Sequence, residues 1–308
     1  MTECDETTNV FGLLGSEYSN FPRKDVAVNA MTALFPAKEQ DASALVRAPE
    51  DILQEALSHK PRKVFVGFSG GNDSLATVLW MMDHVDGCEV FHANTGVGIE
   101  ATRQFVRDTC SERGWKLTEI RAKEDCGQDY DAIVRKHGFP GPKGHQFMYR
   151  RLKERAVETL VRRNKVNWRD KIMIATGIRH DESLVRAGYA GREINSKGSQ
   201  LWVNPLYWWT KTDMSALIDA KNVQRNPVSL LLGMSGECLC GAYAHKGELG
   251  MVSLVCPETA ARIRRLEVDV RAAGHDWGWE DKPPSDEQKF IAKHQTIMPF
   301  CINCEKNG

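Results

Sequence analysis

The stretch Val64-Phe65-Val66-Gly67-Phe68-Ser69-Gly70-Gly71-Asn72-Asp73-Ser74 places a run of β-branched and aromatic residues before a glycine-rich turn. Leu75–Met82 follows with apolar residues at helical spacing. Two glycines let a backbone approach an anion closely, and a helix N-terminus directs unpaired N–H groups at that anion. The segment therefore indicates a phosphate site between a strand and a helix, with a plain capped turn as the alternative.

The side chains of this turn, called here the phosphate loop (residues 68–74), favour the phosphate interpretation. Ser69 and Ser74 add hydroxyl donors. Asp73 is a suitable ligand for Mg²⁺, which binds through carboxylates and substrate phosphates.

Two competing motifs are weaker. The run Gly67-Phe68-Ser69-Gly70-Gly71 fits the G-x-S-x-G elbow of hydrolases, but that fold needs several strands before the elbow and residues 1–62 offer none. The run Gly96-Val97-Gly98-Ile99-Glu100-Ala101 fits the dinucleotide pattern G-x-G-x-x-A, yet it follows the second expected strand instead of the first. The sequence contains no Walker A lysine and no H-E-x-x-H motif.

Strands alternate with helices on both sides of the loop. We expect strands at 64–68, 89–93, 115–121, 171–176 and 200–203, and helices at 75–82, 99–113 and 146–163. This order predicts an α/β fold with a doubly wound, mainly parallel sheet covered by helices on both faces. Ligands of such sheets bind at the carboxyl ends of the strands, where the phosphate loop falls.

The rest of the chain predicts three parts. Residues 1–60 contain no clear strand and include a capped amphipathic helix near Pro49, so we expect a helical N-terminal extension. Residues 61–226 form the α/β domain. Residues 227–308 form a helical, cysteine-containing C-terminal region, in which Cys256–Val270 has the pattern of a helix and 281–286 that of a loop.

Composition excludes several protein classes. The 308 residues include 41 basic and 41 acidic side chains, so no global field draws the chain onto nucleic acid, and any such contact must be a local patch. No apolar run approaches the ~20 residues that span a bilayer, and the acidic N-terminus is not a secretory signal. We expect a cytoplasmic protein without a membrane partner. Nine scattered cysteines then favour metal or redox chemistry over disulfides.

Several segments together resemble the adenine nucleotide α-hydrolase superfamily, which includes N-type ATP pyrophosphatases and phosphoadenosine phosphosulfate (PAPS) reductases. Ser69–Ser74 resembles its SGGxDS loop. The other similar segments, in chain order, are Asn94-Thr95-Gly96, Phe139–Pro142 with His145 and Arg150–Lys153, Gly177-Ile178-Arg179 with Asp181-Glu182-Ser183, and Asn204-Pro205-Leu206 with Trp209, Thr210 and Asp213. The resemblance covers roughly residues 60–240 and implies that superfamily's Rossmann-like fold.

The branch within the superfamily follows from two departures. The tail Cys301-Ile302-Asn303-Cys304-Glu305 lacks the Glu-Cys-Gly motif of PAPS reductases, and the phosphate loop keeps the full ATP-cleaving form. The resemblance therefore implies cleavage of ATP to AMP and pyrophosphate with Mg²⁺, through an adenylylated intermediate that a sulfur nucleophile then attacks.

The resemblance also implies roles for individual residues. Asp73, Ser69 and Arg179 are expected to be catalytic. The residues expected to bind ATP are Phe68, Ser69, Gly70, Gly71, Asn72, Asp73, Ser74, Asn94, Thr95 and Gly177. Those expected to bind the substrate are Arg150, Arg151, Lys153, Asp181 and Glu182. The alternatives are a surface ion pair between Arg179 and Asp181 or Glu182, and a simple turn at Asn94-Thr95.

Basic residues concentrate between Lys143 and Lys171, where ten lysines and arginines face three acidic residues. This stretch is either a solvated helix face or a groove for an anionic substrate, such as a nucleic-acid backbone. Trp202, Trp208 and Trp209 are candidates for base stacking, but we expect them to pack in the core.

Two cysteine pairs, Cys238 with Cys240 and Cys301 with Cys304, could supply four thiolates to one metal site. Thiolate ligands favour an iron–sulfur cluster or Zn²⁺, and we expect the cluster. Cys256 is an alternative ligand. A redox dithiol, or cysteines that only pack, are the other interpretations.

Three functions remain open at this stage. The favoured one is an ATP pyrophosphatase of DNA backbone phosphorothioation, with DNA and a cysteine desulfurase or other sulfur donor as partners and a homodimer as a possible assembly. A tRNA-thiolating ATP pyrophosphatase, with tRNA as partner, or a PAPS or APS reductase is the enzymatic alternative. A nucleotide-sensing scaffold is the non-enzymatic one.

Overall fold

The computed structural model describes residues 46–180 and 193–284, and it confirms the predicted α/β class. Six strands form one sheet in the order β3-β2-β1-β4-β6-β5. Their bounds are β1 (Lys63–Gly67), β2 (Glu89–Asn94), β3 (Leu117–Arg121), β4 (Ile172–Ala175), β5 (Ile194–Lys197) and β6 (Gln200–Val203). All neighbours pair in parallel except β5 and β6, which are antiparallel.

The strand order places a topological switch point between β1 and β4. Strands that follow β1 directly in the chain lie on one side of it, and the later strands lie on the other. In open parallel sheets the loops diverge at such a point and leave a crevice at the carboxyl ends of the two strands. The phosphate loop follows β1, and residues 176–179 follow β4, so both predicted segments border this crevice.

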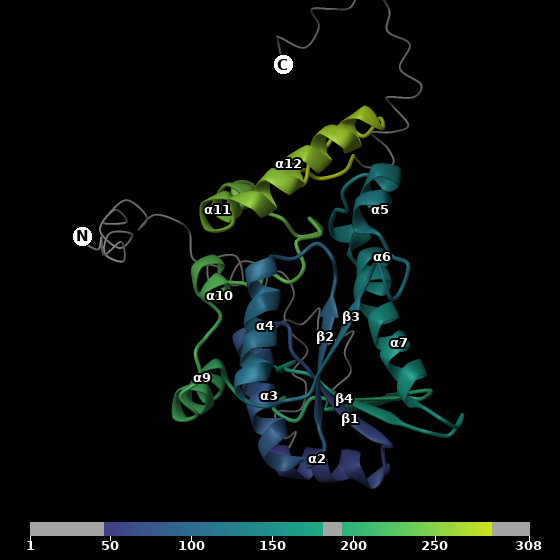
Figure 1. Ribbon diagram of the computed structural model, residues 1–308, viewed down its shortest axis with the longest axis vertical. Helices are drawn as coiled ribbons and strands as arrows, with labels where there is room; N and C mark the ends of the chain where they lie inside the picture. The colour runs from purple at the N-terminus through teal and green to yellow at the C-terminus, as the bar shows by residue number, and fades with distance from the viewer. Residues whose placement is uncertain (1–45, 181–192, 285–308) are drawn as a thin grey trace, which may run out of the picture. The chain divides into compact units, whose positions relative to one another are not determined.

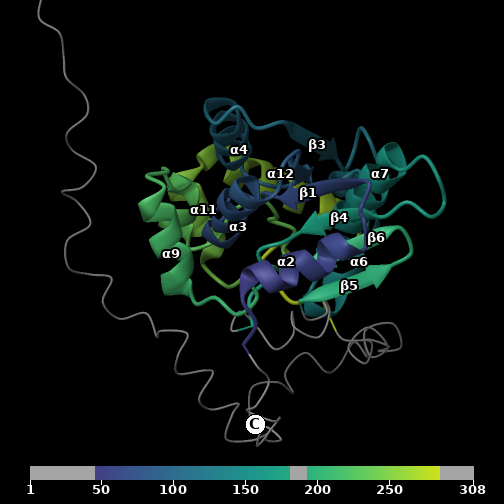
Figure 2. The ribbon, with the colours of Figure 1, turned by 90° about the horizontal axis from the view of Figure 1, so that it is seen from below.

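Helices cover both faces of the sheet, as Figure 1 and the view from below in Figure 2 show. α3 and α4 lie on one face, and the run from α6 to α7 lies on the other. The α-helices are α2 (Pro49–Ser58), α3 (Asn72–His84), α4 (Glu100–Glu112), α5 (Tyr130–His137), α6 (His145–Tyr149), α7 (Arg155–Asn164), α9 (Lys211–Ala220), α10 (Pro227–Leu232), α11 (Glu248–Val255) and α12 (Pro257–Ala272).

Local sequence explains most helix starts. Asp129 caps α5 by accepting hydrogen bonds from two backbone amides, and Thr210 caps α9 in a capping box with Asp213. Asn226 caps α10, whose first residue is proline. The capped helix near Pro49 and the helix predicted at Cys256–Val270 are confirmed as α2 and α12.

The structure departs from the predicted elements in three ways. The single helix expected at 146–163 consists of α6 and α7 joined by a π-helical turn, η2 (Arg150–Glu154). The strand β5 was not predicted, because its sequence Ile-Asn-Ser-Lys is short and polar and lacks alternation. Short helices such as α5 and α10 were also missed, because six to eight residues give too little periodicity.

Three apolar clusters form the core. Two lie on the two faces of the sheet, one beneath α2 and α3 and the other beneath α7. The third joins α5 and α6 to residues 228–279, so the C-terminal region packs on loops at the carboxyl ends of the strands. Trp208 and Trp209 pack against the first cluster and Trp202 against the second, which confirms the expected core role of the tryptophans.

The described residues from Arg47 onward belong to one compact unit, and the predicted division at residue 226 stays a prediction. The expected N-terminal extension is seen as α2, and residues 1–45 lie outside the described residues. Within the described ranges, no helix combines the length and apolarity needed to cross a membrane.

Candidate functional site

The phosphate loop is held by hydrogen bonds among its own hydroxyl groups. The Ser69 amide donates to Ser74 Oγ at 3.2 Å, and Ser74 Oγ donates to the Gly71 carbonyl at 2.8 Å. Ser69 Oγ lies 3.1 Å from Ser74 Oγ. Gly70 adopts φ +77°, and a Cβ there would lie 2.7 Å from Thr102 Cγ2. The turn therefore requires glycine at this position, and the loop joins β1 to the N-terminus of α3 in a fixed shape.

Asp73 and Arg179 meet across the switch point. Arg179 Nη2 lies 3.2 Å from Asp73 Oδ2, and the Arg179 side chain is almost fully buried. Gly177 makes this approach possible, because a Cβ there would lie 2.6 Å from the Asp73 carbonyl oxygen. The structure thus brings together three residues predicted from two separate motifs, and Arg179 pairs with Asp73 instead of lying on the surface.

Two buried polar atoms beside the loop lack hydrogen-bond partners among the described residues. They are Asn72 Oδ1 and Arg179 Nε. Buried polar groups are nearly always paired in folded proteins, so unpaired ones at a glycine loop fit a site that a polar ligand completes. The Asp73 side chain is 29% exposed, and its carboxylate suits Mg²⁺.

Asn226 supports the loop from a distant part of the chain. Its Nδ2 donates to the Gly70 carbonyl at 3.0 Å and to Thr102 Oγ1 at 3.1 Å. The Thr102 hydroxyl in turn donates to the Ser235 carbonyl at 2.7 Å. Sequence reasoning missed this support, because an N-cap asparagine looks like an ordinary helix start.

A buried ionic cluster lies behind the loop and surrounds Glu237. Glu237 Oε2 is 3.3 Å from His92 Nε2 and 3.6 Å from Arg103 Nε. His92 Nδ1 lies 2.7 Å from the Phe68 carbonyl oxygen, at the first residue of the phosphate loop. Burial alone would lower the pKa of His92, but the hydrogen bond and charge of Glu237 raise it. One chain of contacts therefore runs from residue 237 to the phosphate loop.

Sequence reasoning missed this cluster as well. Its one visible signal is His92, a polar residue inside the apolar run of β2. Such a residue must find a buried partner. The partner, Glu237, follows 145 positions later, and no local pattern links the two.

Asn94 and Thr95, predicted to bind ATP, have protein partners. Thr95 donates its amide to Glu237 Oε1 at 2.9 Å and its hydroxyl to the Glu237 carbonyl at 2.6 Å. Asn94 Nδ2 donates to Glu119 Oε1 at 2.6 Å. Burial alone would raise the pKa of Glu119, but hydrogen bonds from Arg107 and Asn94 lower it to about 2. These contacts fix the loop after β2, and the predicted contact with ATP stays a prediction.

Cys238 and Cys240 lie in a tight turn, called here the cysteine turn (residues 237–241). A hydrogen bond with Cys240, together with the charge of Lys153, lowers the pKa of Cys238, although burial opposes the shift. The same bond raises the pKa of Cys240. Trp279 Nε1 donates to the Leu239 carbonyl at 2.8 Å and closes the turn from the other side. Two adjacent thiols, one readily ionised, fit the chemistry of a soft metal ion.

The other predicted metal ligands are not placed near this turn. Cys301 and Cys304 lie outside the described residues. Cys256 is buried at the start of α12. Within 46–180 and 193–284, no three His, Cys, Asp or Glu side chains gather as a metal site. The four-thiolate site therefore stays a prediction.

The basic residues predicted to bind substrate lie along the π-helical turn η2. Lys153 is close enough to act on Cys238, and Arg151 Nη1 donates to Gln128 Oε1 at 3.0 Å. Arg150 is solvent-exposed and lies 3.7 Å from Glu154. Asp181 and Glu182 lie outside the described residues. Among the described members of this set, Lys153 alone is thereby linked to another predicted site residue.

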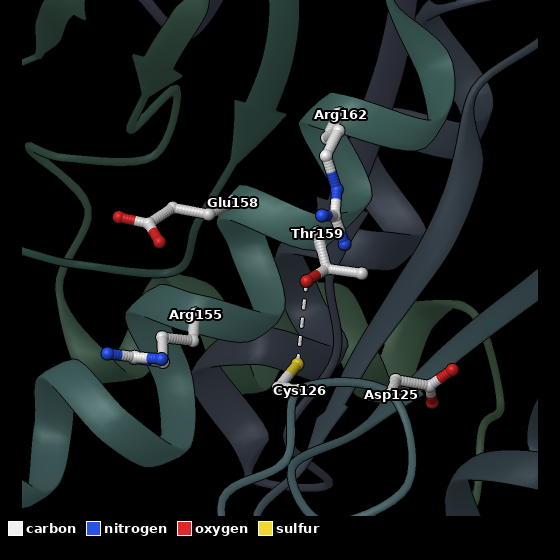
Figure 3. A pocket seen from close by; sticks show the side chains of 6 residues that line it. All are labelled: Asp125, Cys126, Arg155, Glu158, Thr159 and Arg162. Carbon is white, nitrogen blue, oxygen red and sulfur yellow. Dashed lines mark hydrogen bonds between the residues drawn. The ribbon is translucent and has the colours of Figure 1, made fainter.

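A pocket of about 290 Å³, drawn in Figure 3, lies away from the phosphate loop. It lies between the turn after β3 and one side of α7, where Cys126 Sγ is 3.5 Å from Thr159 Oγ1. β3 is the edge strand, two strands from β1, so this pocket is separate from the phosphate loop.

Comparison with known families decides the identity of the fold. The sequence profile described as "Phosphoadenosine phosphosulfate reductase domain" matches residues 63–230, which is more than half of the chain. The chain belongs to the PAPS reductase family. The match begins with β1 and ends within α10, so it includes the phosphate loop, Arg179 and Asn226. The protein is therefore a nucleotide-utilising enzyme of this family, and the resemblance seen in the sequence is confirmed. No curated protein matches the chain.

Several solved structures are similar to this chain at low sequence identity. A PAPS reductase from Candida auris is 18% identical with a TM-score of 0.45, and the match covers 62% of this chain and 87% of that one. The U34-tRNA thiolase NcsA from Methanococcus maripaludis, solved with its [4Fe-4S] cluster, is 12% identical with a TM-score of 0.36. That match covers 80% of this chain and 89% of the thiolase. The NH3-dependent NAD synthetase from Campylobacter jejuni is 15% identical with a TM-score of 0.41. That match covers 77% of this chain and 94% of the synthetase. The family assignment rests on the domain match.

Proposed function

We propose that the protein is an ATP pyrophosphatase that adenylylates a substrate oxygen for sulfur insertion, with the backbone of DNA as the acceptor. The observation that carries the proposal is the phosphate loop with its partner Arg179. The sequence Ser-Gly-Gly-Asn-Asp-Ser is complete, and its two hydroxyl groups and the N-terminus of α3 converge on one turn. Such a turn suits a leaving pyrophosphate, which carries more charge than a single phosphate group.

The reaction divides into two displacements. First, an oxygen of the acceptor attacks the α-phosphorus of ATP, and pyrophosphate leaves as the new P–O bond forms. Second, a sulfur nucleophile at the oxidation level of sulfide, released from a donor such as a cysteine desulfurase by a thiol reductant, attacks the activated phosphorus and forms a P–S bond. AMP then leaves with the former acceptor oxygen. The protein's main task is to stabilise charge on the phosphoryl groups during the first step.

The residues at the switch point suit that task. The backbone amides of the loop, Ser69 and Ser74 would bind the two outer phosphates. Arg179 is buried and cationic, so it would stabilise charge that develops on the α-phosphate in a water-poor setting. Asp73 would orient Arg179 through the ion pair at 3.2 Å and supply a carboxylate to Mg²⁺.

The cysteine turn has a place in the same proposal. Cys238 and Cys240, with Cys301 and Cys304, would hold an iron–sulfur cluster or, as the alternative, Zn²⁺. A metal bound there would supply a Lewis-acidic, sulfur-binding centre close to the nucleotide. Through Glu237, the turn contacts Thr95 and the cluster behind the phosphate loop. The metal site and the nucleotide site would then be connected through the buried contacts of Glu237.

A second candidate, PAPS reduction, follows from the family assignment itself. One experiment separates the two. The purified protein is incubated with ATP, Mg²⁺ and single-stranded DNA, and in parallel with PAPS and a thiol reductant. Pyrophosphate from the first mixture, without sulfite from the second, supports the proposal. Sulfite without pyrophosphate would contradict it and establish the reductase.

A further inference from the structure

A row of aromatic and basic side chains runs along one side of α6 and η2. His145, Tyr149 and Lys153 follow one another at intervals of four residues, the spacing of one helix face. The rings of His145 and Tyr149 have centroids 6.1 Å apart. Tyr243, from the segment after the cysteine turn, brings its ring to 4.8 Å from that of His145. These four residues are called here the aromatic stripe.

The aromatic stripe presents its rings at the protein surface. Tyr243 is 55% exposed and Tyr149 is 40% exposed. Tyrosine rings of this kind are normally found in the core or at an interface, and a cluster of them at the surface usually marks a binding site. The tryptophans singled out in the sequence pack against the core, as expected, so the exposed aromatic surface is formed by other residues.

Positive charge accompanies the rings. Arg150 follows Tyr149 directly, and its side chain is 72% exposed. Lys153 ends the stripe. The only charged partner that the structure gives Arg150 among the described residues is Glu154, at 3.7 Å and on the surface. Such exposed pairs contribute little, so the guanidinium can exchange this partner for a phosphate at small cost.

The stripe also lies beside the candidate sulfur site. Tyr243 is three residues after Cys240, and that short link is fixed, because the Tyr130 hydroxyl donates to the Cys240 carbonyl at 3.0 Å. The cysteine turn is therefore flanked by the Glu237 cluster on one side and by the stripe on the other.

We propose that the aromatic stripe is the surface that binds single-stranded DNA, with a base stacked on Tyr243 and Tyr149 and the neighbouring phosphates on Arg150 and Lys153. The proposal rests on the proposed function, because it names the residues that receive its acceptor. Stacking on tyrosine requires an unpaired base, so a duplex would have to open locally. The combination of flat rings and cations matches nucleic acid, which alternates flat bases with anionic phosphates.

A binding measurement with matched variants tests the proposal. Fluorescence anisotropy follows a labelled DNA oligonucleotide of about 16 nucleotides, the upper end of common single-strand site sizes. We expect Tyr243→Ala to weaken binding roughly 5- to 150-fold, the effect of losing one stacked base, and Tyr243→Phe to bind like the wild type. Trp168→Ala is the control. Trp168 is also exposed, but it lies in the turn before β4, at the amino end of that strand, whereas the phosphate loop lies at the carboxyl ends of the strands.

Salt dependence tests the phosphate contact separately. For Arg150→Ala we expect the slope of log affinity against log salt to fall by about 0.7, the value for one phosphate of a single strand. Thermal unfolding of each variant shows whether it folds. If Tyr243→Ala does not fold, the expected wild-type binding by Tyr243→Phe still tests whether an aromatic ring at this position is sufficient for binding DNA. Equal binding by Tyr243→Ala and the wild type, or an equal loss in Trp168→Ala, would overturn the proposal.

Two further arms separate this proposal from the enzymatic one. Tighter, Tyr243-dependent binding of an RNA oligonucleotide of the same sequence would overturn the assignment to DNA. Tyrosine-dependent DNA binding without pyrophosphate release from ATP would contradict the proposed function alone, and pyrophosphate release without such binding would contradict the stripe alone.

Discussion

Glu237 accepts a hydrogen bond from the Thr95 backbone amide at 2.9 Å, and so fastens the residue before Cys238 to the loop after β2. The same carboxylate lies 3.3 Å from His92, which contacts the first carbonyl of the phosphate loop. Two segments with different expected chemistry, one for phosphate and one for sulfur, are therefore joined by a single buried acid.

Removal of this acid should destabilise the protein. Glu237→Ala removes the buried carboxylate beside Arg103 and His92 and leaves Arg103 only its pair with the exposed Glu100, and breaking a buried pair costs about 3–5 kcal/mol. Glu237→Gln keeps an acceptor for Thr95 but not the charge, so we expect an intermediate loss. Urea unfolding measures both. Glu258→Gln, at an exposed position on α12, should change stability by about 0.5 kcal/mol or less. Equal stability of Glu237→Ala and Glu258→Gln would show that the cluster is not structural.

Close packing of the two loops gives a second prediction. A Cβ at Gly98 would clash with the backbone of Glu237, and its distance to the Glu237 Cα would be 2.8 Å. Gly98→Ala should therefore cost about 1–3 kcal/mol, as overpacking does. Gly250→Ala in α11 is the control, because a Cβ there meets no atom within 4 Å and alanine favours a helix. Denaturant midpoints compare the two, and a neutral Gly98→Ala would speak against the close approach.

Asn226 should affect nucleotide binding through Gly70. Asn226→Ser keeps a helix cap but loses the donor to the Gly70 carbonyl, whereas Asn226→Ala loses both. We expect both variants to bind ATP roughly 2- to 10-fold more weakly, the effect of one hydrogen bond, and only the alanine variant to lose the cap as well. Calorimetric titration with ATP and thermal unfolding measure the two effects. Wild-type affinity in Asn226→Ser would show that the bond to Gly70 is irrelevant to the nucleotide.

The pKa of Glu119 predicts a pH dependence of stability. Its pKa is about 2 in the folded protein and near the ordinary 4.5 when the chain is unfolded. Because the folded pKa is the lower one, the ionised group stabilises the protein above about pH 4.5. That contribution, at most about 3 kcal/mol, is lost as the pH falls towards 2. The stability gap between wild type and Glu119→Gln should shrink over this range in urea unfolding. A gap that does not change with pH would contradict the lowered pKa.

The sequence was sufficient for those features that local pattern determines. The strands from β1 to β4 and β6 and the phosphate loop follow from apolar runs, alternation and two glycines, all within short windows. The position of Asp73 and Arg179 at one site also follows, because parallel strands end at one edge and the motifs lie after β1 and β4, but their ion pair was not predicted.

The residues that support the site could not be predicted in the same way. Asn226 and Gly70 are 156 positions apart, and Glu237 and Thr95 are 142 apart. Such contacts depend on how residues after 226 fold back over the strand ends. Local spacing does not encode that return. The exposed rings of Tyr149 and Tyr243 were missed for the same reason, since they come from separate segments.

The most direct test of the central claim uses ATP labelled at the γ-phosphate, with Mg²⁺ and single-stranded DNA. If the phosphate loop binds the two outer phosphates while the innermost one reacts, the labelled product is pyrophosphate. Its release should then fall about 100-fold or more in Asp73→Ala. Asp83→Ala, at the far end of α3, should retain the wild-type rate. Labelled orthophosphate as the product, or equal pyrophosphate release by Asp73→Ala and the wild type, would contradict the claim.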